Sequence, residues 1–174
     1  MVMLSPKFKA RSSKHLQGCH DLLRELFNGV IEKRDIAVIC GLRSALEQNA
    51  EFMKRASQLD GFKRKSKHQV GHVFKGTAQD VSLAADVVPY PVTWRHRVFI
   101  DLARVVFKEA LDKKIPIRWG GDWNQNFDFE DQKMVDMPHW ELIDPDKCTW
   151  VGHPLMEEFV FSDKTPEKFY GNYK

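Results

Sequence analysis

The sequence predicts an α+β fold, in which helices pack on a small antiparallel sheet within a single compact domain. Two long segments repeat apolar residues at the spacing of an amphipathic helix, and short apolar runs lie around them. A chain of 174 residues is most simply one domain and is long enough to bury its own core. Its 43% hydrophobic and 29% charged residues are usual for a globular protein. We therefore expect one domain over residues 1–174.

The first half of the chain predicts a helix, a strand and a second helix, in that order. Apolar residues recur at helical spacing within residues 16–33, namely Leu22, Leu23, Leu26, Phe27, Val30 and Ile31. The run "DIAVIC" predicts a short buried strand that ends at Gly41. The stretch "SALEQNAEFMKRASQ" contains no Gly or Pro and predicts a helix. Arg43 is therefore expected at a turn from strand to helix.

The second half predicts one long helix and two strands. Residues 94–113 repeat apolar side chains at helical spacing, "IPIRWG" is typical of a strand, and "GDWNQNFDFEDQK" is typical of a polar, aromatic loop. Alternation in "PHWELI" places His139 and Glu141 on one face of a final strand, and Trp140 and Leu142 on the other. From about residue 162 we expect a flexible C-terminal tail.

Composition excludes several classes of protein. The three cysteines are an odd number and lack CxxC spacing, so neither a disulfide framework nor a cysteine zinc site is expected. No stretch predicts a signal peptide or a membrane span, which favours folding in a reducing cytoplasm. The net charge is only +3, and at this charge the basic clusters "FKRKSKH" and "DKTPEKFYGNYK" are more simply solvated faces than a phosphate-binding surface. Nucleic acid is therefore not expected as a partner.

The segment "SKHQVGHVFKGTAQDVSLAADVVPYP" concentrates residues that bind metals. It contains His68, His72, Asp80 and Asp86, and His139 follows later in the chain. A catalytic zinc ion usually takes three protein ligands from His, Asp, Glu or Cys and leaves one position for water. Each of these residues alone is more often a turn former or a surface residue. Residue types alone therefore leave the ligand set open.

Five short motifs occur in a fixed order along the chain: "GLRSALEQN", "SKHQVG", "AADVVPYP", "RWGGDWN" and "DMPHWEL". Together they resemble the phage L-alanyl-D-glutamate endolysins and the related D-alanyl-D-alanine carboxypeptidases, both of the LAS group of zinc peptidases. The resemblance covers most of the chain. It implies a LAS/hedgehog-like peptidase fold and Zn²⁺ as the cofactor.

The family motifs imply roles for individual residues. The family carries S-x-H-x-x-G-x-A-x-D, whose His and Asp bind zinc, and a later D-x-x-H, whose His is the third ligand and whose acidic residue is the catalytic base. Ser66, His68 and Gly71 match the first half of the first motif, and Asp136 and His139 match the second motif. The resemblance therefore implies that His68 and His139 bind zinc and that Asp136 is the base.

The middle ligand is the position at which this sequence departs from the family. Six residues separate the His from the Asp in the family motif, whereas residues 69–85, seventeen in all, separate His68 from Asp86. An eleven-residue insertion, residues 72–82, restores the motif on either side of a loop that could form a lid. The rival reading uses "GTAQD" and makes Asp80 the ligand, but it places Val73 where a His is needed. Asp86 is favoured because "DVVPY" matches the family's D-x-x-P-Y continuation.

Further residues match the family near the substrate. Arg43 in "GLRS" resembles an arginine that faces the substrate, where a guanidinium could polarise the scissile carbonyl or hold the developing oxyanion. Ser66 is implied to orient a peptide carboxylate. Gln48 and Trp123 are more simply a polar helix residue and a core tryptophan. Glu141 is expected beside His139 as a supporting partner and not as a ligand.

The resemblance implies a peptidoglycan-degrading zinc endopeptidase that hydrolyses the L-Ala-D-Glu bond of the stem peptide by metal-activated water. Such an endolysin would be a monomer that waits in the host cytoplasm and reaches the cell wall after a holin permeabilises the membrane. Two alternatives remain open. One is a D-alanyl-D-alanine carboxypeptidase with the same zinc site, and the other is a non-catalytic wall-binding module.

Overall fold

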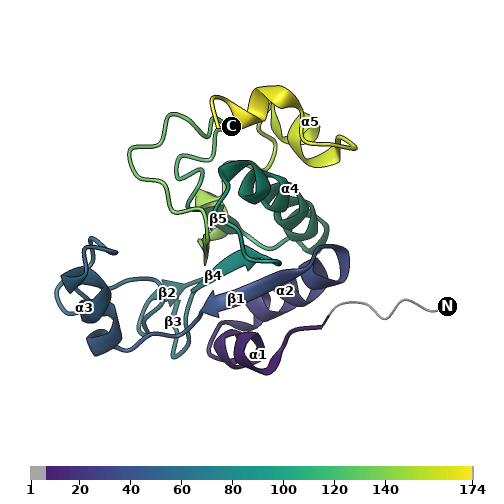
Figure 1. Ribbon diagram of the computed structural model, residues 1–174. Coiled ribbons are helices and arrows are strands. Elements are labelled where there is room, and N and C mark those ends of the chain that lie inside the picture. Colours follow the sequence, from purple (N-terminus) through teal and green to yellow (C-terminus); the bar gives the residue numbers. More distant parts are fainter. Residues whose placement is uncertain (1–6, 174) are drawn as a thin grey trace.

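A four-stranded antiparallel sheet with the strand order β1-β4-β6-β5 forms the centre of the computed structural model, which describes residues 7–173 (Figure 1). Its strands are β1 (Ile36–Cys40), β4 (Ala84–Pro89), β5 (Ile117–Trp119) and β6 (His139–Leu142). A separate hairpin consists of β2 (Val73–Phe74) and β3 (Thr77–Ala78). The predicted α+β class with a small antiparallel sheet is confirmed.

The described part of the chain contains five α-helices: α1 (Ala10–Gln17), α2 (Asp21–Lys33), α3 (Ala45–Met53), α4 (His96–Lys113) and α5 (Met156–Phe161). Two 3-10 helices follow the last strand, η1 (Pro145–Lys147) and η2 (Glu167–Tyr170). Helix α4 packs against β4 and α2, while α1 packs against β1. Figure 1 shows α3 apart from this layer, beyond the end of β1. None of the helices in residues 7–173 is both long enough and apolar enough to cross a membrane.

Aromatic side chains fill the core on the helix-covered face of the sheet. Trp119 and Trp140 are cross-strand partners on β5 and β6, and their rings stack with centroids 5.5 Å apart and an interplanar angle of 14°. The Phe107 ring of α4 contacts both indoles, with centroids at 6.5 and 5.4 Å. All three side chains are buried. This packing determines the register of β5 against β6.

The helix predicted over residues 16–33 was wrong in its first turn. The structure ends α1 at Gln17 and begins α2 at Asp21. Between them, Cys19 forms a β-bridge with Ser82, and the Nδ1 atom of His20 accepts a hydrogen bond from the Leu22 amide as a helix cap. Because the bridge partner is far away in the sequence, helical periodicity alone could not reveal the break.

Other predicted elements are confirmed, with shorter bounds. Strands lie within "DIAVIC", "IPIRWG" and "PHWELI", and the helix over 94–113 begins at His96. Residues 121–133 contain no helix or strand. Helix α3 ends at Met53 and not at Gln58, because Arg55 adopts a left-handed φ of 61° that a helix cannot continue. Strand β4 and helix α5 were not among the predicted elements.

Residues 72–82, expected as an insertion, fold as the β2-β3 hairpin. Its turn has positive φ at Lys75 (49°) and Gly76 (77°), as a two-residue hairpin turn requires. Phe74 is buried, and its ring meets the ring of His20 edge to face at 5.2 Å. The Lys75 amide donates to the Asp144 carboxylate at 2.9 Å. These contacts anchor the hairpin to the body of the domain, which argues against a mobile lid.

The segment after residue 162 was expected to be flexible, but the structure packs it against the domain. Phe169 and Tyr170 are buried, and the Tyr170 hydroxyl donates to the Asp101 carboxylate. The guanidinium of Arg97 lies 3.9 Å from the centre of the Tyr170 ring. The segment packs on the domain because its two aromatic side chains bury enough apolar surface to hold a short polar stretch of chain. Lys174 lies outside the described residues.

Candidate active site

The face of the sheet opposite the tryptophan stack carries a row of polar residues. Cys40, Asp86 and His139 are cross-strand partners on β1, β4 and β6. The register of β1 against β4 shifts between Val38 and Cys40, and this shift brings Cys40 opposite Asp86. Irregularities of this kind re-aim side chains beside functional sites. Pairing of three adjacent strands thus brings together residues that are distant in the sequence.

His68 reaches the same place from the loop before the hairpin. The His68 carbonyl accepts a hydrogen bond from the Arg43 amide at 2.8 Å, and the Lys67 carbonyl accepts one from the Leu83 amide at 2.9 Å. The loop is therefore tied both to the turn after β1 and to the start of β4. His68 is only 2% exposed. Its ring is directed at the polar row by backbone hydrogen bonds on both sides.

Three side-chain atoms converge at the centre of the site. His68 Nε2 lies 3.1 Å from Asp86 Oδ1 and 3.3 Å from His139 Nδ1, and His139 Nδ1 lies 3.3 Å from Asp86 Oδ1. The structure thus brings His68, Asp86 and His139 together. Asp80 makes no side-chain hydrogen bond to any described residue and does not line the cavity at this cluster. Asp86, and not Asp80, is therefore the aspartate that lies beside the two imidazoles.

Each imidazole has one nitrogen directed at Asp86 and a second, outward nitrogen directed away from it. The outward nitrogen faces an acceptor that carries no proton of its own. His68 Nδ1 lies 2.7 Å from the Gly41 carbonyl oxygen, and His139 Nε2 lies 3.1 Å from a Glu141 carboxylate oxygen. Each outward nitrogen must therefore carry the proton and donate it. In the neutral tautomers, both inward nitrogens present lone pairs to Asp86. Three electron-rich atoms at contact distance require a positive charge between them.

The spacing of these atoms suits a tetrahedral metal ion. Two ligand atoms about 2.0–2.1 Å from a tetrahedral zinc ion lie about 3.3 Å from each other. The three observed separations, 3.1, 3.3 and 3.3 Å, match one face of such a tetrahedron. Two imidazoles and one carboxylate are a common donor set for catalytic zinc. The residues therefore fit a divalent ion with an open fourth position.

Cys40 offers a second possible donor. One ligand atom from each of Cys40, His68 and Asp86 lies within 4.8 Å of the others, so these residues also form a potential metal-binding cluster. However, the Cys40 sulfur lies 3.8 Å from His68 Nδ1, the nitrogen that faces the Gly41 carbonyl, and it accepts a hydrogen bond from Arg43 at 3.1 Å. Cys40 thus contacts the outer side of His68.

The electrostatics of the cluster favour positive charge. Burial lowers the pKa of His68, but the charge and hydrogen bond of Asp86 outweigh burial and raise it to about 10. Burial opposes protonation of His139 as well, yet hydrogen bonds to Asp86 and Glu141 raise its pKa to about 9. Burial would raise the pKa of Asp86, but both imidazoles hold it well below its ordinary value. Protons and a metal ion therefore compete for the same place.

A cavity of about 500 Å³ opens in front of the cluster and contains every sequence-predicted site residue. Its lining includes the three clustered residues together with Arg43, Ser66, Trp123, Asp136 and Glu141. Ser66 is buried at the cavity wall, where its hydroxyl accepts a hydrogen bond from the His68 amide at 3.3 Å. Trp123, expected in the core, is only partly buried and faces the His139 ring at 5.4 Å. The expectation of a core tryptophan was therefore wrong.

Arg43 lies at the turn from β1 to α3, as predicted. Its guanidinium donates to the Gln48 side-chain oxygen at 2.7 Å and lies 3.5 Å from the Asp86 carboxylate. Gln48 is fully buried and donates in turn to the Leu59 carbonyl at 2.8 Å. Gln48, expected as an ordinary polar helix residue, thus fixes the direction of Arg43. The guanidinium is held beside the cluster at the cavity wall.

Asp136 lines the same cavity. Its backbone amide donates to the Gly120 carbonyl at 2.8 Å, which fixes the chain, but its carboxylate makes no hydrogen bond or ion pair within residues 7–173. Burial raises the pKa of Asp136, although the charge of His139 opposes the change. A side chain at Gly120 would collide with the Asp136 carbonyl, at 2.3 Å from an added Cβ. An unpaired, desolvated carboxylate of this kind can accept a proton.

Arg118 is the cavity residue that the sequence analysis missed. It lies on β5 directly opposite Glu141 of β6, to which it donates hydrogen bonds at 2.5 and 3.1 Å. These contacts, together with those of His139, lower the pKa of Glu141 to about 2 against the effect of burial. A signal was present in the strand pattern, because Arg118 stands between the buried Ile117 and Trp119 and so must point to the other face.

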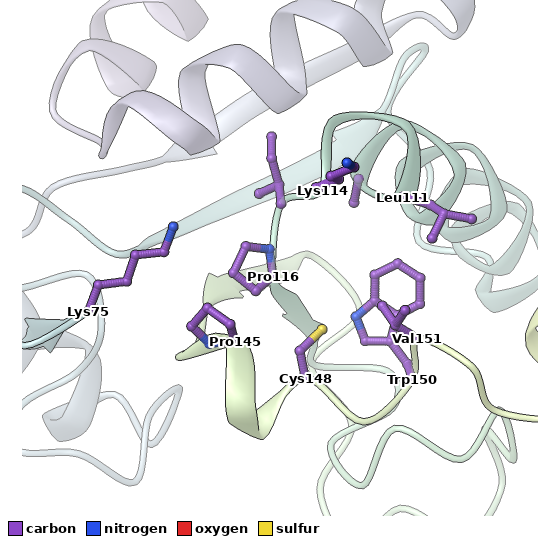
Figure 2. A pocket seen from close by; sticks show the side chains of 10 residues that line it. Lys75, Leu111, Lys114, Pro116, Pro145, Cys148, Trp150 and Val151 are labelled. Carbon is purple, nitrogen blue, oxygen red and sulfur yellow. The ribbon is translucent and has the colours of Figure 1, made fainter.

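A second cavity, of about 340 Å³, lies away from the cluster and is shown in Figure 2. It is formed at the C-terminal end of α4 and around η1, with the side chains of Pro116, Pro145, Cys148 and Trp150 gathered at its centre. Its lining contains no carboxylate or imidazole. Burial raises the pKa of Cys148 to about 11, so its thiol is not a ready nucleophile. The chemistry of the chain is therefore concentrated in the first cavity.

Comparison with known proteins identifies a family and a structure with a similar fold. A family model described as phage L-alanyl-D-glutamate peptidase matches residues 4–143. The fold is similar to the crystal structure of the Serratia marcescens L-Ala D-Glu endopeptidase ChiX, with a TM-score of 0.60 and 26% sequence identity over 80% of this chain and 91% of that chain. No curated protein sequence matches. All residues of the cluster lie inside the matched region.

The raised pKa values of His68 and His139 predict a pH-dependent stability for the metal-free protein. Both folded-state values, about 10 and 9, exceed the ordinary value of 6.5, so this stabilisation is complete below pH 6.5 and is lost as pH rises through 9 to 10. The free energy of unfolding of the chelator-treated protein, measured with urea, should fall by on the order of 1–3 kcal/mol between pH 7 and pH 10. The Asp86→Asn variant should show a flatter profile over the same range. If the free energy of unfolding changed with pH in the same way in both proteins, Asp86 would not be the cause of the raised pKa values.

Proposed function

The chain belongs to the phage L-alanyl-D-glutamate peptidase family, and from this premise we propose that it is a zinc endopeptidase that hydrolyses the L-Ala-D-Glu bond of the peptidoglycan stem peptide. The family match and the similarity to an L-Ala D-Glu endopeptidase support an enzyme that acts on the peptide of peptidoglycan. The observation that carries the zinc proposal is the convergence of two imidazole nitrogens and one carboxylate oxygen within 3.1–3.3 Å.

We assign the metal ligands as His68 Nε2, Asp86 Oδ1 and His139 Nδ1. This set is preferred to one that includes Cys40, because it leaves both outward nitrogens in their hydrogen bonds to Gly41 and Glu141. Such outer partners orient ligating imidazoles and fix their tautomers. Zinc bound there would polarise the scissile carbonyl and lower the pKa of a water molecule towards neutrality.

The remaining cavity residues supply proton transfer and charge stabilisation. Asp136, unpaired and desolvated, would accept the proton of the attacking water and pass it to the amine of the departing D-glutamate. Arg43, aimed by Gln48, would donate hydrogen bonds to the carbonyl oxygen as it gains negative charge. Ser66 would help to orient the peptide at the cavity wall. Each role is assigned to a side chain that lines one cavity.

We further propose that the protein acts as a monomer, made in the host cytoplasm and released to the wall by a holin-like partner. The support is the phage family itself, whose substrate lies on the far side of the cytoplasmic membrane. Expression in a bacterial host should leave cells intact until a membrane-permeabilising agent is added, and lysis should then follow within minutes. Equal lysis without the agent would contradict dependence on a release partner.

Cleavage products of purified peptidoglycan test the function directly. Mass spectrometry after incubation with the zinc-loaded protein should reveal fragments with a new D-glutamate amino terminus. His68→Ala and Asp86→Ala should lose both zinc and product, whereas the matched control Asp80→Ala should keep both. Release of free D-alanine instead would favour a carboxypeptidase, and bound zinc with no product would favour a wall-binding module.

The Asp136→Asn variant separates the proton-transfer role from metal binding. Amide replacement keeps the shape of the side chain but removes its basicity, so turnover should fall about 10²- to 10⁴-fold. Zinc content, measured by atomic absorption, should stay near that of the unaltered protein. Loss of zinc would instead make Asp136 part of the metal site, and full activity would remove it from the mechanism.

A further inference from the structure

The cavity in front of the His68-Asp86-His139 cluster forms a cleft, and this cleft contains a cation that the proposed mechanism does not use. The Arg118 side chain is 34% exposed and lines the same cavity as the His68-Asp86-His139 cluster. Its Nε and Nη2 atoms both donate to one oxygen of Glu141. Its Nη1 atom makes no hydrogen bond to any residue that the structure describes. Part of the guanidinium fork is therefore free on the cavity side.

The position of this guanidinium is fixed from two directions. Glu141 holds one edge, and the Trp123 ring lies against the group, with its centroid 5.4 Å from the guanidinium carbon. Glu141 is buried and is itself held by His139 at 3.1 Å. An arginine held in this way loses little further freedom when it binds a planar anion. The site is thus preorganised for a carboxylate.

Charge is unevenly distributed along the cleft. Lys65 and Lys67 also line this cavity, and neither makes an ion pair with any described residue. A neighbouring cavity of about 470 Å³ shares Arg43 and Lys65 with the first, but its wall includes the exposed apolar side chains of Leu42, Phe62 and Val70. The two cavities therefore meet at Arg43. Apart from these shared residues, the first cavity contains Arg118 and Lys67, and the second combines the three apolar side chains with Ser44, Glu47 and Gln69.

The two sides of the scissile bond in the stem peptide differ in the same way. D-glutamate is joined to the next residue through its side-chain carboxyl, so its α-carboxylate is free, and diaminopimelate adds a further carboxylate. On the other side, L-alanine is joined to the sugar by a neutral lactyl amide. Bidentate pairing makes arginine the preferred partner of a carboxylate.

We propose that Arg118 is a specificity residue, which binds a carboxylate of the D-glutamate-containing fragment and so orients the substrate across the metal site. This inference rests on the proposed function. The fragment that carries the carboxylates lies towards β5, and the sugar-linked L-alanine lies towards α3. Glu141 then serves two partners, because one carboxylate holds both the ligand His139 and the substrate-binding Arg118.

Three synthetic muramoyl tripeptides test this proposal. The first contains D-glutamate and diaminopimelate, the second replaces the D-glutamate α-carboxylate by a carboxamide, and the third replaces diaminopimelate by lysine. A charge-assisted hydrogen bond should give the first substrate a KM about 10- to 100-fold lower than that of whichever analogue lacks the recognised carboxylate. The Arg118→Gln variant should lose this discrimination while it keeps its zinc content.

A matched control is Arg97→Gln. Arg97 has a similar side-chain exposure of 35%, pairs with Glu167 and lies over the Tyr170 ring, but it is outside the cleft. It should leave the discrimination unchanged. If Arg118→Gln keeps the discrimination, or if it loses zinc and lowers turnover of all substrates equally, Arg118 only positions Glu141 and the proposal is wrong.

Failure of the proposed endopeptidase function would give a different result from failure of the Arg118 proposal. If the unaltered protein binds zinc but cleaves none of the tripeptides, the proposed endopeptidase reaction fails. Calorimetric binding of the dipeptide γ-D-glutamyl-diaminopimelate then decides the role of Arg118. Binding that weakens at least about 10-fold in Arg118→Gln and stays unchanged in Arg97→Gln would still support the carboxylate site. Equal binding by all three proteins, or none, would overturn it.

Discussion

A half-buried carboxylate on an inner strand is the constraint on which the site depends. Asp86 faces two imidazoles and a guanidinium, and a charge in such a place is tolerable only because these partners surround it. Its location on β4, paired with both β1 and β6, explains why the partners arrive from three separate parts of the chain. The turn after β1 carries Arg43, β6 carries His139, and the loop tied to the start of β4 carries His68.

Strand alternation lets four consecutive residues serve both the core and the site. In β6, Trp140 and Leu142 enter the hydrophobic core, while His139 and Glu141 line the cavity. The stack of Trp140 on Trp119 fixes the register of β5, and that register places Arg118 opposite Glu141. Packing of the tryptophans on one face of the sheet therefore determines which polar side chains lie opposite each other on the other face. A shift of one residue would bury the cavity residues and expose the tryptophans.

The sequence allowed prediction of the fold class and of several residues that the structure brings into one cavity, Arg43 among them, because short motifs and strand alternation are local signals. It did not reveal the break at Cys19, which depends on a bridge to Ser82 sixty-three residues away (82 − 19). Arg118 was missed for a related reason. An arginine between two apolar residues marks a strand with two different faces, but only the cross-strand pairing shows that its partner is Glu141. The role of Gln48 was not predicted, because this residue acts only by holding the Arg43 side chain in place.

The hairpin of residues 72–82 lies between His68 and Asp86 in the sequence, and backbone hydrogen bonds hold the chain on both sides of it. The Gly71 amide donates to the Gln79 carbonyl at 2.7 Å, so the hairpin closes on itself where it leaves the domain. Beyond it, Ser82 bonds to Gly18 and His20 through the backbone, and Leu83 bonds to Lys67. Both ends are thus fixed independently of what lies between them. Since the entropy of loop closure grows only slowly with length, the length of this segment costs little, and the separation of His68 and Asp86 is set by the backbone bonds at the base.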